Sequence, residues 1–310
     1  MKMIIEKFYP GFTKKAITFT IDDGNVELDR KFINTVKPAG IFGTFNFPTV
    51  NLNRYTKDDY IKLYSGFGIA NHCKYHPFAF VPDEEYRIST DKFDADTANP
   101  EFLYKSDVCG LYYINRKNRW QKIADKDGYL RFVDEAKAEL EAVFGEGSVK
   151  SYVWPYCEQK DSSILAEIVK KGYRSIRKTG EVKDSTGYAL PADRMHWSYN
   201  ANHASLLEEA KKYDEYEIKD GELKFFAFGV HSHDFENNDC WWILEEFAQK
   251  YGNRREDFYY ASVDDIFDYE DAMNLLKADE GKLTNNSNLP LYLKINGEYL
   301  IIEAGASITR

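Results

Sequence analysis

Two adjacent carboxylates, Asp22 and Asp23, stand in the sequence Thr-Ile-Asp-Asp-Gly at residues 20–24. They follow the apolar run of residues 16–19, which has the pattern of a strand. Because side chains alternate along a strand, both carboxylates reach one site only if the chain turns here, and Gly24 permits such a turn. The pair therefore predicts a chemical site at a strand end. The alternative is that both residues cap and charge the helical pattern that follows.

Two histidines come next, in Asn-His-Cys-Lys-Tyr-His-Pro at residues 71–77. His72 and His76 are four positions apart, as on one face of a helix, but Pro77 disfavours a helical His76. We therefore place both on a loop after a short strand. Two imidazoles and one carboxylate form a common ligand set for a divalent metal ion, so this pair and the upstream aspartates predict a metal site. A hydrogen-bonded core histidine is the ordinary alternative.

A third cluster, Phe-Gly-Val-His-Ser-His-Asp-Phe at residues 228–235, again places a histidine, His231, after a strand-like run. From residue 16 to residue 144 the sequence alternates strand and helix patterns, which predicts a parallel sheet or barrel. In such folds, ligand sites gather at the carboxyl ends of the strands. All three clusters fall at such ends, so we expect them to meet in one site.

These clusters resemble, in the same order, the motifs of the polysaccharide deacetylase family, the NodB-homology group also known as carbohydrate esterase family 4. Residues 20–24 are similar to its T-F-D-D-G motif, residues 71–77 to N-H-[ST]-x-x-H-P and residues 153–157 to R-x-P-Y-G. His231 is similar to the histidine of the late L-x-H motif. The resemblance covers roughly residues 15–270 and implies an α/β fold, a distorted (β/α) barrel of the NodB-homology type, similar to a TIM barrel.

The resemblance also implies roles for the matched residues. Three would hold a divalent metal ion, most simply zinc, with cobalt, nickel or manganese as alternatives: Asp23, His72 and His76. Asp22 would be the base that completes the activation of water, and His231 would protonate the leaving group. The backbone N–H of Tyr156 would stabilise the oxyanion. Four further residues are expected beside the substrate: Trp154, Pro155, Trp197 and Arg177.

The sequence departs from the family at the third motif, where Val153 stands in place of the arginine that orients the catalytic aspartate. Arg177 ends the next strand-like run, and we expect it to reach the site from a neighbouring strand and pair with Asp22. A surface arginine on an edge is the alternative. Cys73 and Cys157 depart as well, because the family usually has Ser or Thr and Gly there. The spacing of the four cysteines predicts free thiols.

Two segments lie outside the family pattern. Residues 77–127 form a long insertion rich in Asp, Tyr, Phe and Asn, for which we weigh a wall or lid over the site against a surface elaboration with its own small core. In the first case four aromatic residues would stack on sugar faces: Tyr104, Tyr112, Tyr113 and Trp120. Residues 281–310 follow a main domain of residues 1–280, and their two strand-like runs joined by Asn-Gly predict a C-terminal β-hairpin appendage.

Composition limits the partners. The net charge of −10 over 310 residues argues against nucleic acid and anionic membranes, whose binding needs clustered Lys and Arg. No apolar run reaches transmembrane length, and residues 1–15 lack the apolar core of a signal peptide. We therefore expect a cytoplasmic protein whose substrate is neutral or cationic. The family resemblance implies that this substrate is a carbohydrate.

The function that the family resemblance implies is that of a metal-dependent hydrolase acting on carbon–nitrogen bonds, which removes an acetyl group from an amide, or an ester, on a carbohydrate. Three alternatives remain: a catalytically impaired carbohydrate-binding homologue, a metal-dependent hydrolase of a non-sugar amide, and a non-heme iron oxygenase. The last is included because two histidines and one carboxylate also suit iron. The second aspartate argues against it, since an oxygenase needs no second carboxylate base.

Overall fold

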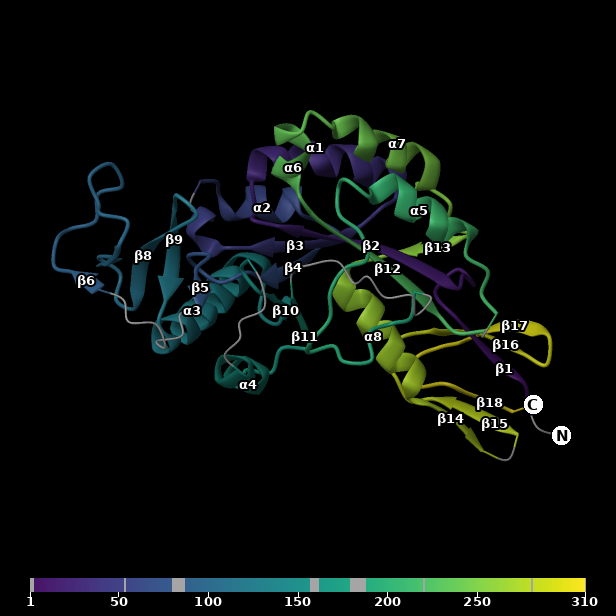
Figure 1. The fold of residues 1–310 in the computed structure, drawn as a ribbon. Coiled ribbons are helices and arrows are strands. Elements are labelled where there is room, and N and C mark those ends of the chain that lie inside the picture. Colours follow the sequence, from purple (N-terminus) through teal and green to yellow (C-terminus); the bar gives the residue numbers. More distant parts are fainter. Residues whose placement is uncertain are drawn as a thin grey trace.

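The computed structural model describes residues 3–52, 54–79, 87–156, 162–178, 188–219, 221–279 and 281–309 of the chain. Its main body is a sheet whose strands lie in the order β11 (Ser175–Arg177), β10 (Val149–Val153), β4 (Gly68–Asn71), β3 (Gly43–Phe47), β2 (Lys15–Asp22) and β12 (Lys224–His231) (Figure 1). A further strand, β13 (Phe258–Tyr260), also pairs with β2. All of these pairings are parallel, so the carboxyl ends of the strands lie at one edge of the sheet.

Helices cover both faces of this sheet (Figure 1). One face is covered by α1 (Val26–Val36), α2 (Lys57–Leu63), α3 (Lys126–Phe144), α4 (Ser162–Lys170), α5 (Leu206–Glu215), α6 (Ser232–Asn237) and α7 (Trp241–Tyr251), which all contribute to the main hydrophobic core. The opposite face is covered by α8 (Val263–Asn274), which contributes to a second core. Two 3-10 turns follow α1 and β3: η1 (Lys37–Ala39) and η2 (Thr49–Asn51). Among the described residues, no helix combines the length and hydropathy that a bilayer span requires.

Side-chain alternation assigns the two faces of the sheet. In β12, Phe226 and Phe228 point into the main core, whereas Phe225 and Ala227 point into the second core beneath α8. Towards the carboxyl ends of the strands, the α8 face carries buried polar side chains in place of apolar ones: Thr20, Asp22, Asn46 and Arg177. The alternation that builds the core therefore also directs a polar group to one end of the sheet.

The sheet curls, and an irregular segment joins its two edges. This segment, residues 194–201, accepts hydrogen bonds from both edges. The backbone N–H of Lys178, just after β11, donates to Trp197 O (2.9 Å), and the N–H of Gly229 in β12 donates to Ala201 O (2.9 Å). Trp197 thereby bridges to Arg177 of β11, and Ala201 bridges to Phe228 of β12. The fold is a distorted (β/α) barrel, and the fold class predicted from the sequence is confirmed.

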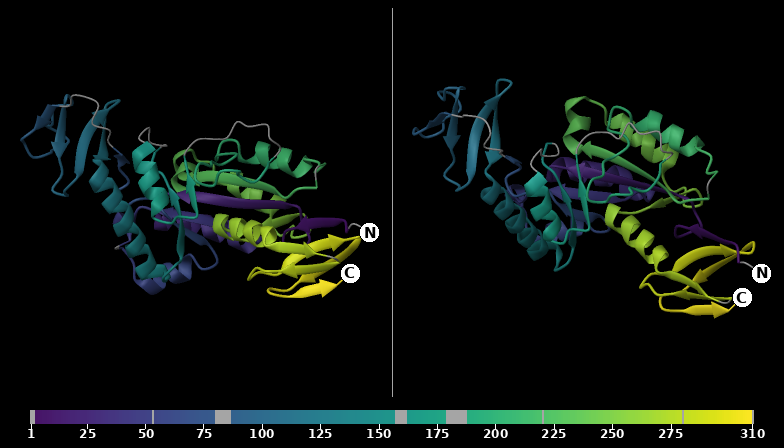
Figure 2. Two further views of the ribbon diagram at one scale, coloured as in Figure 1. Left: turned by 90° about the horizontal axis from the view of Figure 1, so that it is seen from below. Right: turned by 60° about the horizontal axis from the view of Figure 1, so that its bottom comes forward.

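The insertion of residues 77–127 projects from one end of the body in its own sheet (Figures 1 and 2). Its strands lie in the order β5 (Phe78–Ala79), β9 (Arg119–Ala124), β8 (Leu111–Arg116), β7 (Phe102–Lys105) and β6 (Arg87–Ser89). Three buried apolar residues form its core: Leu103, Ile114 and Ile123. Tyr113 stacks on Phe93 with ring centroids 4.0 Å apart, and Tyr104 and Trp120 pack against the same ring. This packing supports the surface elaboration with its own core.

The C-terminal part lies at the other end of the body and forms two antiparallel sheets (Figures 1 and 2). The first contains β1 (Ile5–Phe8), β16 (Leu291–Ile295) and β17 (Glu298–Ile302), and the second contains β14 (Leu276–Asp279), β15 (Lys282–Asn285) and β18 (Ser307–Thr309). The β16–β17 hairpin turns at Asn296 and Gly297, both at positive φ. Local sequence patterns cannot show the partnership of β16 with β1, which starts the chain. The division at residue 280 stays a prediction.

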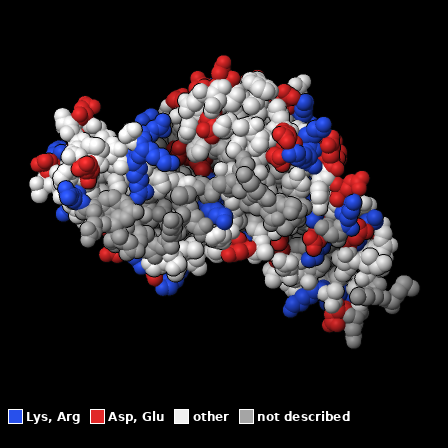
Figure 3. Space-filling model, in the orientation of Figure 1, with Lys and Arg blue, Asp and Glu red and all other residues white. Residues whose placement is uncertain are grey.

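The surface carries both signs of charge. The sequence has 41 Lys and Arg against 51 Asp and Glu residues. Figure 3 shows these basic and acidic side chains interspersed over the face that it presents. Such mixing is the usual surface of a globular domain.

Asp29 is a buried carboxyl group on α1, beside the residue that follows His231. Its Oδ1 and Oδ2 accept hydrogen bonds from Ser232 Oγ (2.7 Å) and Tyr64 OH (2.8 Å). Burial raises the pKa of Asp29 from 3.8 to about 7, although the two hydroxyl groups partly offset this effect. The folded protein therefore keeps Asp29 protonated in a pH range where the unfolded chain has released that proton.

The contribution of Asp29 to stability is expected to fall as the pH rises from about 4 to about 7, because at this group the unfolded state then binds up to one proton fewer than the folded state. The contribution of Asp29 is complete below pH 3.8 and is lost as the pH rises through about 7. The shift corresponds to roughly 4 kcal/mol at most. At pH 8, Asp29→Asn should therefore unfold at a higher urea concentration than wild type. In both proteins Asp264, whose pKa burial raises to about 6, adds a slope of the same sign, and His76, whose pKa is lowered to about 4, adds one of the opposite sign. The difference between the two profiles therefore reports Asp29. Parallel wild-type and variant profiles of unfolding free energy against pH would contradict the prediction.

Candidate active site

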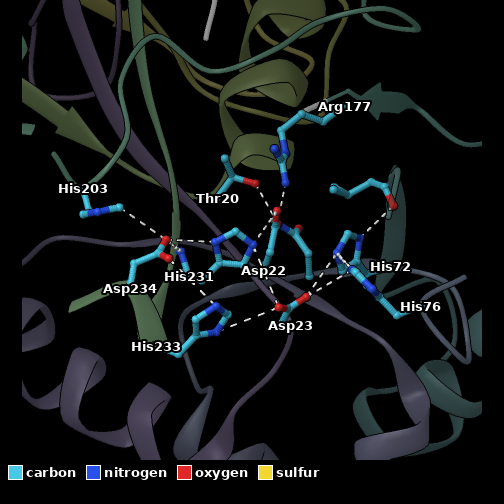
Figure 4. A network of polar contacts seen from close by, with 12 residues as sticks. Thr20, Asp22, Asp23, His72, His76, Arg177, His203, His231, His233 and Asp234 are labelled. Atoms are coloured by element: carbon cyan, nitrogen blue, oxygen red, sulfur yellow. Dashed lines mark hydrogen bonds and ion pairs between the residues drawn. The ribbon is translucent and has the colours of Figure 1, made fainter. Parts of the chain in front are cut away.

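The carboxyl-end edge of the barrel brings together polar side chains from all three clusters found in the sequence (Figure 4). They come from the ends of β2, β11 and β12, from the loop after β4, from α6 and, for His203, from the turn before α5. The group includes Thr20, Asp22, Asp23, His72, His76, Arg177, His203, His231, His233 and Asp234. Three carboxylates and several imidazoles therefore share one site.

The turn after β2 separates the two aspartates. Asp22 ends the strand, whereas Asp23 and Gly24 have φ angles of 75° and 57°. A Cβ atom at position 24 would lie 2.5 Å from the ring of Phe47, so glycine is required here by both conformation and space. The cap of α1 is Asn25, whose side chain accepts a hydrogen bond from the first turn of the helix. The alternative in which the two aspartates cap the helix is therefore wrong.

The histidine loop is anchored to the core by Asn71. Its Nδ2 donates to Val133 O (2.8 Å) and to the hydroxyl of Tyr173 (2.7 Å), and its Oδ1 accepts from the backbone N–H of Cys73 (2.8 Å). Cys73 and His76 adopt left-handed backbone conformations, with φ of 61° and 53°. The loop therefore turns tightly enough for its two imidazoles to point back towards β2.

His72, His76 and Asp23 form a triangle of donor atoms. Nδ1–H of His72 donates to Val153 O (2.9 Å), which leaves its Nε2 facing the site. This Nε2 lies 3.1 Å from Nε2 of His76, and Asp23 Oδ1 lies 3.6 Å and 3.2 Å from these two nitrogens. A tetrahedral ion with ligands at about 2.0–2.1 Å separates them by roughly 3.3–3.4 Å. Asp23 Oδ1 is also buried without a hydrogen-bond partner among the described residues, so the triangle fits a divalent ion.

The protonation states of this triangle suit metal binding. Burial raises the pKa of Asp23, but the neighbouring imidazoles of His72 and His76 outweigh it and hold that pKa well below its ordinary value. Burial, together with the charge of His72, lowers the pKa of His76 to about 4. At neutral pH, Asp23 is therefore ionised and His76 neutral, as metal ligands must be.

Asp22 is a buried carboxylate held through one oxygen. Its Oδ1 accepts hydrogen bonds from Asn46 Nδ2 (2.6 Å) and from the guanidinium of Arg177. Its Oδ2 lies 3.9 Å from Nε2 of His231. Burial raises the pKa of Asp22, but Arg177 and the neighbouring histidines bring it below its ordinary value. Asp22 is therefore ionised, with Oδ2 directed at His231.

Arg177 reaches Asp22 across the curled sheet, since three strands separate β11 from β2. Its side chain is fully buried, with 0% exposure, and lies over the ring of Tyr199, 5.4 Å from the centroid. A Cβ atom at Gly229 would lie 2.0 Å from that ring, so glycine there makes room for this packing. The Asp22 ion pair expected from the sequence is present, and the surface-arginine alternative is wrong. The guanidinium is fully buried against Asp22, and the expectation that Arg177 lies beside the substrate stays a prediction.

His231 ends β12 and is oriented by Asp234. Its Nδ1–H donates to Asp234 Oδ2 (2.9 Å), and its Nε2 lies 3.9 Å from Asp22 Oδ2 and from Asp23 Oδ2. Burial lowers the pKa of His231, but Asp234 and the charges of Asp22 and Asp23 more than compensate and raise it to about 9. This imidazole is therefore protonated at neutral pH.

Tyr156 lies at the rim of the donor triangle. Its ring stacks on Phe78, with centroids 3.8 Å apart, and meets the ring of His76 edge-on at 4.5 Å. Its φ angle is 64°, so Tyr156 joins Asp23 and His76 in the left-handed region that non-glycine residues rarely adopt. Such conformations persist where the surroundings hold them, and they are common at functional sites.

Three other residues expected beside the substrate lie in the interior. Trp154 is 1% exposed and packs on Tyr129 in the main core, and Pro155 is buried. Trp197 is 4% exposed and packs against Phe225 in the second core. Packing is the role that the structure shows for these three residues, and their contact with substrate stays a prediction. An aromatic residue at a strand end looks the same in sequence whether its ring faces a core or a cleft.

The described cysteines lie outside the donor triangle and the Asp22–His231 pair. Cys73, Cys109 and Cys240 are free thiols, and Cys157 lies outside the described residues. Burial raises the pKa of the Cys73 thiol far above its ordinary value, so this residue is no nucleophile at neutral pH.

Three residues of the site received no role from the sequence: Asn46, His233 and Asp234. Asn46 stands between Phe45 and Phe47 in a buried strand, so alternation alone places it opposite the main core. His233 and Asp234 lie in the segment that carries His231. Their orientation depends on α6, which the sequence analysis did not predict.

The profile of the polysaccharide deacetylase family matches residues 10–176, slightly more than half of the chain. The matched range includes the donor triangle and Asp22 but ends before Arg177 and His231. A search of curated proteins finds no match.

Solved structures with a similar fold include three carbohydrate-active proteins. The Xyl-CE4 domain of a multidomain xylanase from the hindgut metagenome of Trinervitermes trinervoides is 12% identical, with a TM-score of 0.44 over 84% of this chain and 92% of that chain. A polysaccharide deacetylase from Bacillus cereus is 13% identical, with a TM-score of 0.43 over 80% and 91%. A family 4 acetyl xylan esterase from Clostridium thermocellum, in complex with cobalt, is 11% identical, with a TM-score of 0.43 over 81% and 90%.

Proposed function

This chain belongs to the polysaccharide deacetylase family, and we propose that it is a metal-dependent hydrolase that removes an acetyl group from an amide, or an ester, on a carbohydrate. One observation carries the proposal. Asp22 and His231 are each held by an ionic partner, and their free atoms, Oδ2 and Nε2, lie 3.9 Å apart. Both lie beside a triangle of donors with the spacing of a metal site. A base, an acid and a metal site are the parts that acyl hydrolysis needs.

Asp23, His72 and His76 would hold the divalent ion, with zinc as the first candidate and cobalt, nickel or manganese as alternatives. When bound, the ion would polarise the acetyl carbonyl and lower the pKa of water. The chain contributes three ligands, and Nδ1–H of His72 is engaged with Val153 O, which fixes the ring for coordination through Nε2.

Asp22 would act as the general base. Because Arg177 and Asn46 engage Oδ1, the second oxygen, Oδ2, is directed at the site and would take the proton of the attacking water. Arg177 keeps the carboxylate ionised in a buried position, where an unpaired carboxyl group would be protonated.

His231 would act as the general acid. Asp234 holds its Nδ1–H, so the proton on Nε2 is available to the leaving nitrogen or oxygen when the tetrahedral intermediate collapses. The raised pKa, about 9, ensures that this proton is present at neutral pH.

The backbone N–H of Tyr156 would stabilise the oxyanion that forms on the acetyl carbon. Its left-handed φ turns the backbone after β10, and the contact of its ring with His76 places this turn beside the donor triangle.

The ion pair of Asp22 weakens the case for an impaired binding homologue. That alternative was motivated by the missing arginine at Val153, and the structure supplies a guanidinium to Asp22 from Arg177 instead.

Acetate release from a substrate panel tests the proposal. The panel contains N-acetylated and O-acetylated oligosaccharides and simple N-acetyl amides, assayed with protein that is metal-loaded, chelator-treated, or reloaded with zinc, cobalt, nickel or manganese. We expect release from acetylated sugars, its loss on chelation and its return on reloading. Release that chelation leaves unchanged would contradict the metal role. Bound metal at one equivalent without release from any sugar would contradict the deacetylase assignment.

A further inference from the structure

A second group of metal-type donors adjoins the first. His231, His233 and Asp234 each offer one ligand atom, and these atoms all lie within 4.8 Å of one another. Asp234 Oδ2 lies 2.9 Å from Nδ1 of His231, and Asp234 Oδ1 lies 3.9 Å from Nε2 of His233. The two imidazole rings are 4.7 Å apart between centroids. Two imidazoles and a carboxylate suit the same borderline divalent ions as the first triangle.

No other interaction among the described residues gives His233 a role. Among the described residues its ring nitrogens make no hydrogen bond, and the nearest carboxylates are Asp234 and Asp23, each at 3.9 Å. Figure 4 shows its ring between these two carboxylates. The side chains of His231 and His233 are 37% and 34% exposed, so an ion has access and both rings have room to close on it.

A buried nitrogen beside this cluster also lacks a hydrogen bond among the described residues. This nitrogen is Nδ1 of His203, and it lies 3.4 Å from Asp234 Oδ2. Unsatisfied buried polar atoms are rare, and an ion or its bound water is a common reason for one. This observation is independent of the spacing of the other three residues.

We propose that His231, His233 and Asp234 bind a second divalent cation, separate from the one that Asp23, His72 and His76 would hold. The two sites share no ligand. The nearby carboxylates give this region a negative charge, which Arg177 reduces and an ion in the first site reduces further. The second site therefore binds its ion more weakly than the first.

Occupancy of the second site inhibits hydrolysis, a consequence that rests on the proposed function. Binding displaces a proton from the His231 ring to solvent, because a nitrogen that coordinates an ion must be deprotonated. That nitrogen is then withdrawn from the hydrogen bond and proton transfer through which this residue acts as the acid. Excess metal ion therefore inhibits the enzyme by occupying the second site, and this inhibition is called the brake below.

Equilibrium dialysis of the full-length protein against zinc measures the number of ions bound. We expect two equivalents for wild type and one for His233→Gln, with a second dissociation constant weakened by more than about tenfold. His196→Gln, which removes a histidine outside the cluster, is the matched control and keeps two. A single equivalent in wild type, or two unchanged equivalents in His233→Gln, would overturn the site. Asp234→Asn is the second variant if His233→Gln does not fold, as judged by thermal melts.

Acetate release against free zinc tests the brake separately. Wild-type activity should fall with a midpoint at the second dissociation constant, and the ratio of activity at excess zinc to that at one equivalent should approach one in His233→Gln. Two bound equivalents without inhibition would overturn the brake but leave the site. If no substrate is hydrolysed, the proposed function and the brake fail together, while the dialysis result still decides the site.

Discussion

Replacing Asp22 by Asn is expected to lower kcat/KM for acetate release by roughly 10²- to 10⁴-fold, with one equivalent of metal still bound. The amide keeps the shape of the carboxylate but accepts no proton at neutral pH. Asp22 lies outside the donor triangle, so its loss removes the base and spares the ligands. Metal content and steady-state kinetics measured on the same preparation check both parts.

Asp29→Asn is the matched control for this substitution. It also removes a buried carboxyl group, on α1, and Asp29 contacts neither the donor triangle nor the ring of His231. Its activity should stay close to that of wild type. Full activity in Asp22→Asn would show that Asp22 is not the base, and loss of metal in that variant would show that Asp22 is a ligand.

The second large effect is expected for Arg177→Met. Without the guanidinium, burial dominates and the pKa of Asp22 rises, so the acid limb of the kcat/KM profile moves to higher pH. The carboxylate is also left buried and unpaired, which destabilises the fold by roughly 3–5 kcal/mol. A pH–rate profile and urea unfolding at the same pH measure the two consequences.

Arg174→Met controls for the loss of a nearby positive charge. Arg174 lies on the approach to β11 and pairs with Asp268 (2.7 Å) and Asp271 in a partly exposed cluster. Its loss should cost less than about 1 kcal/mol and leave the acid limb in place. Arg177→Lys retains a positive charge and serves if the Met variant does not fold. Arg177 variants with an unshifted acid limb would show that the ion pair does not set the ionisation of Asp22.

The sequence was sufficient for the elements whose signals are local. A strand followed by Asp-Asp-Gly, and a histidine pair ended by Pro77, have patterns that depend only on neighbouring residues, and the structure places these residues as expected. Parallel strands send all their carboxyl ends to one edge, so the meeting of the three clusters follows from topology alone.

Other features depend on contacts that no local pattern reports. Trp154 and Trp197 were assigned to the substrate, yet packing buries both rings. His233 points into the site because α6 starts directly after β12, a helix too short for its periodicity to be read from sequence. β1 pairs with β16, which brings together the N-terminal and C-terminal parts of the chain, and the residues of neither strand indicate this pairing.

The central position of β2 has a consequence for the order in which the protein takes shape during synthesis. Its first residue, Lys15, pairs with Lys224, a separation of 209 residues, and β12 lines one whole edge of β2. At roughly 5–20 residues per second, that edge waits on the order of 10–40 s for its partner to leave the ribosome. Until then β2 offers unpaired backbone groups to any other strand. Asp22 lacks its two partners during most of the same interval, because Arg177 and His231 are also synthesised long after it. The nascent chain therefore exposes an aggregation-prone edge for as long as its active site is incomplete.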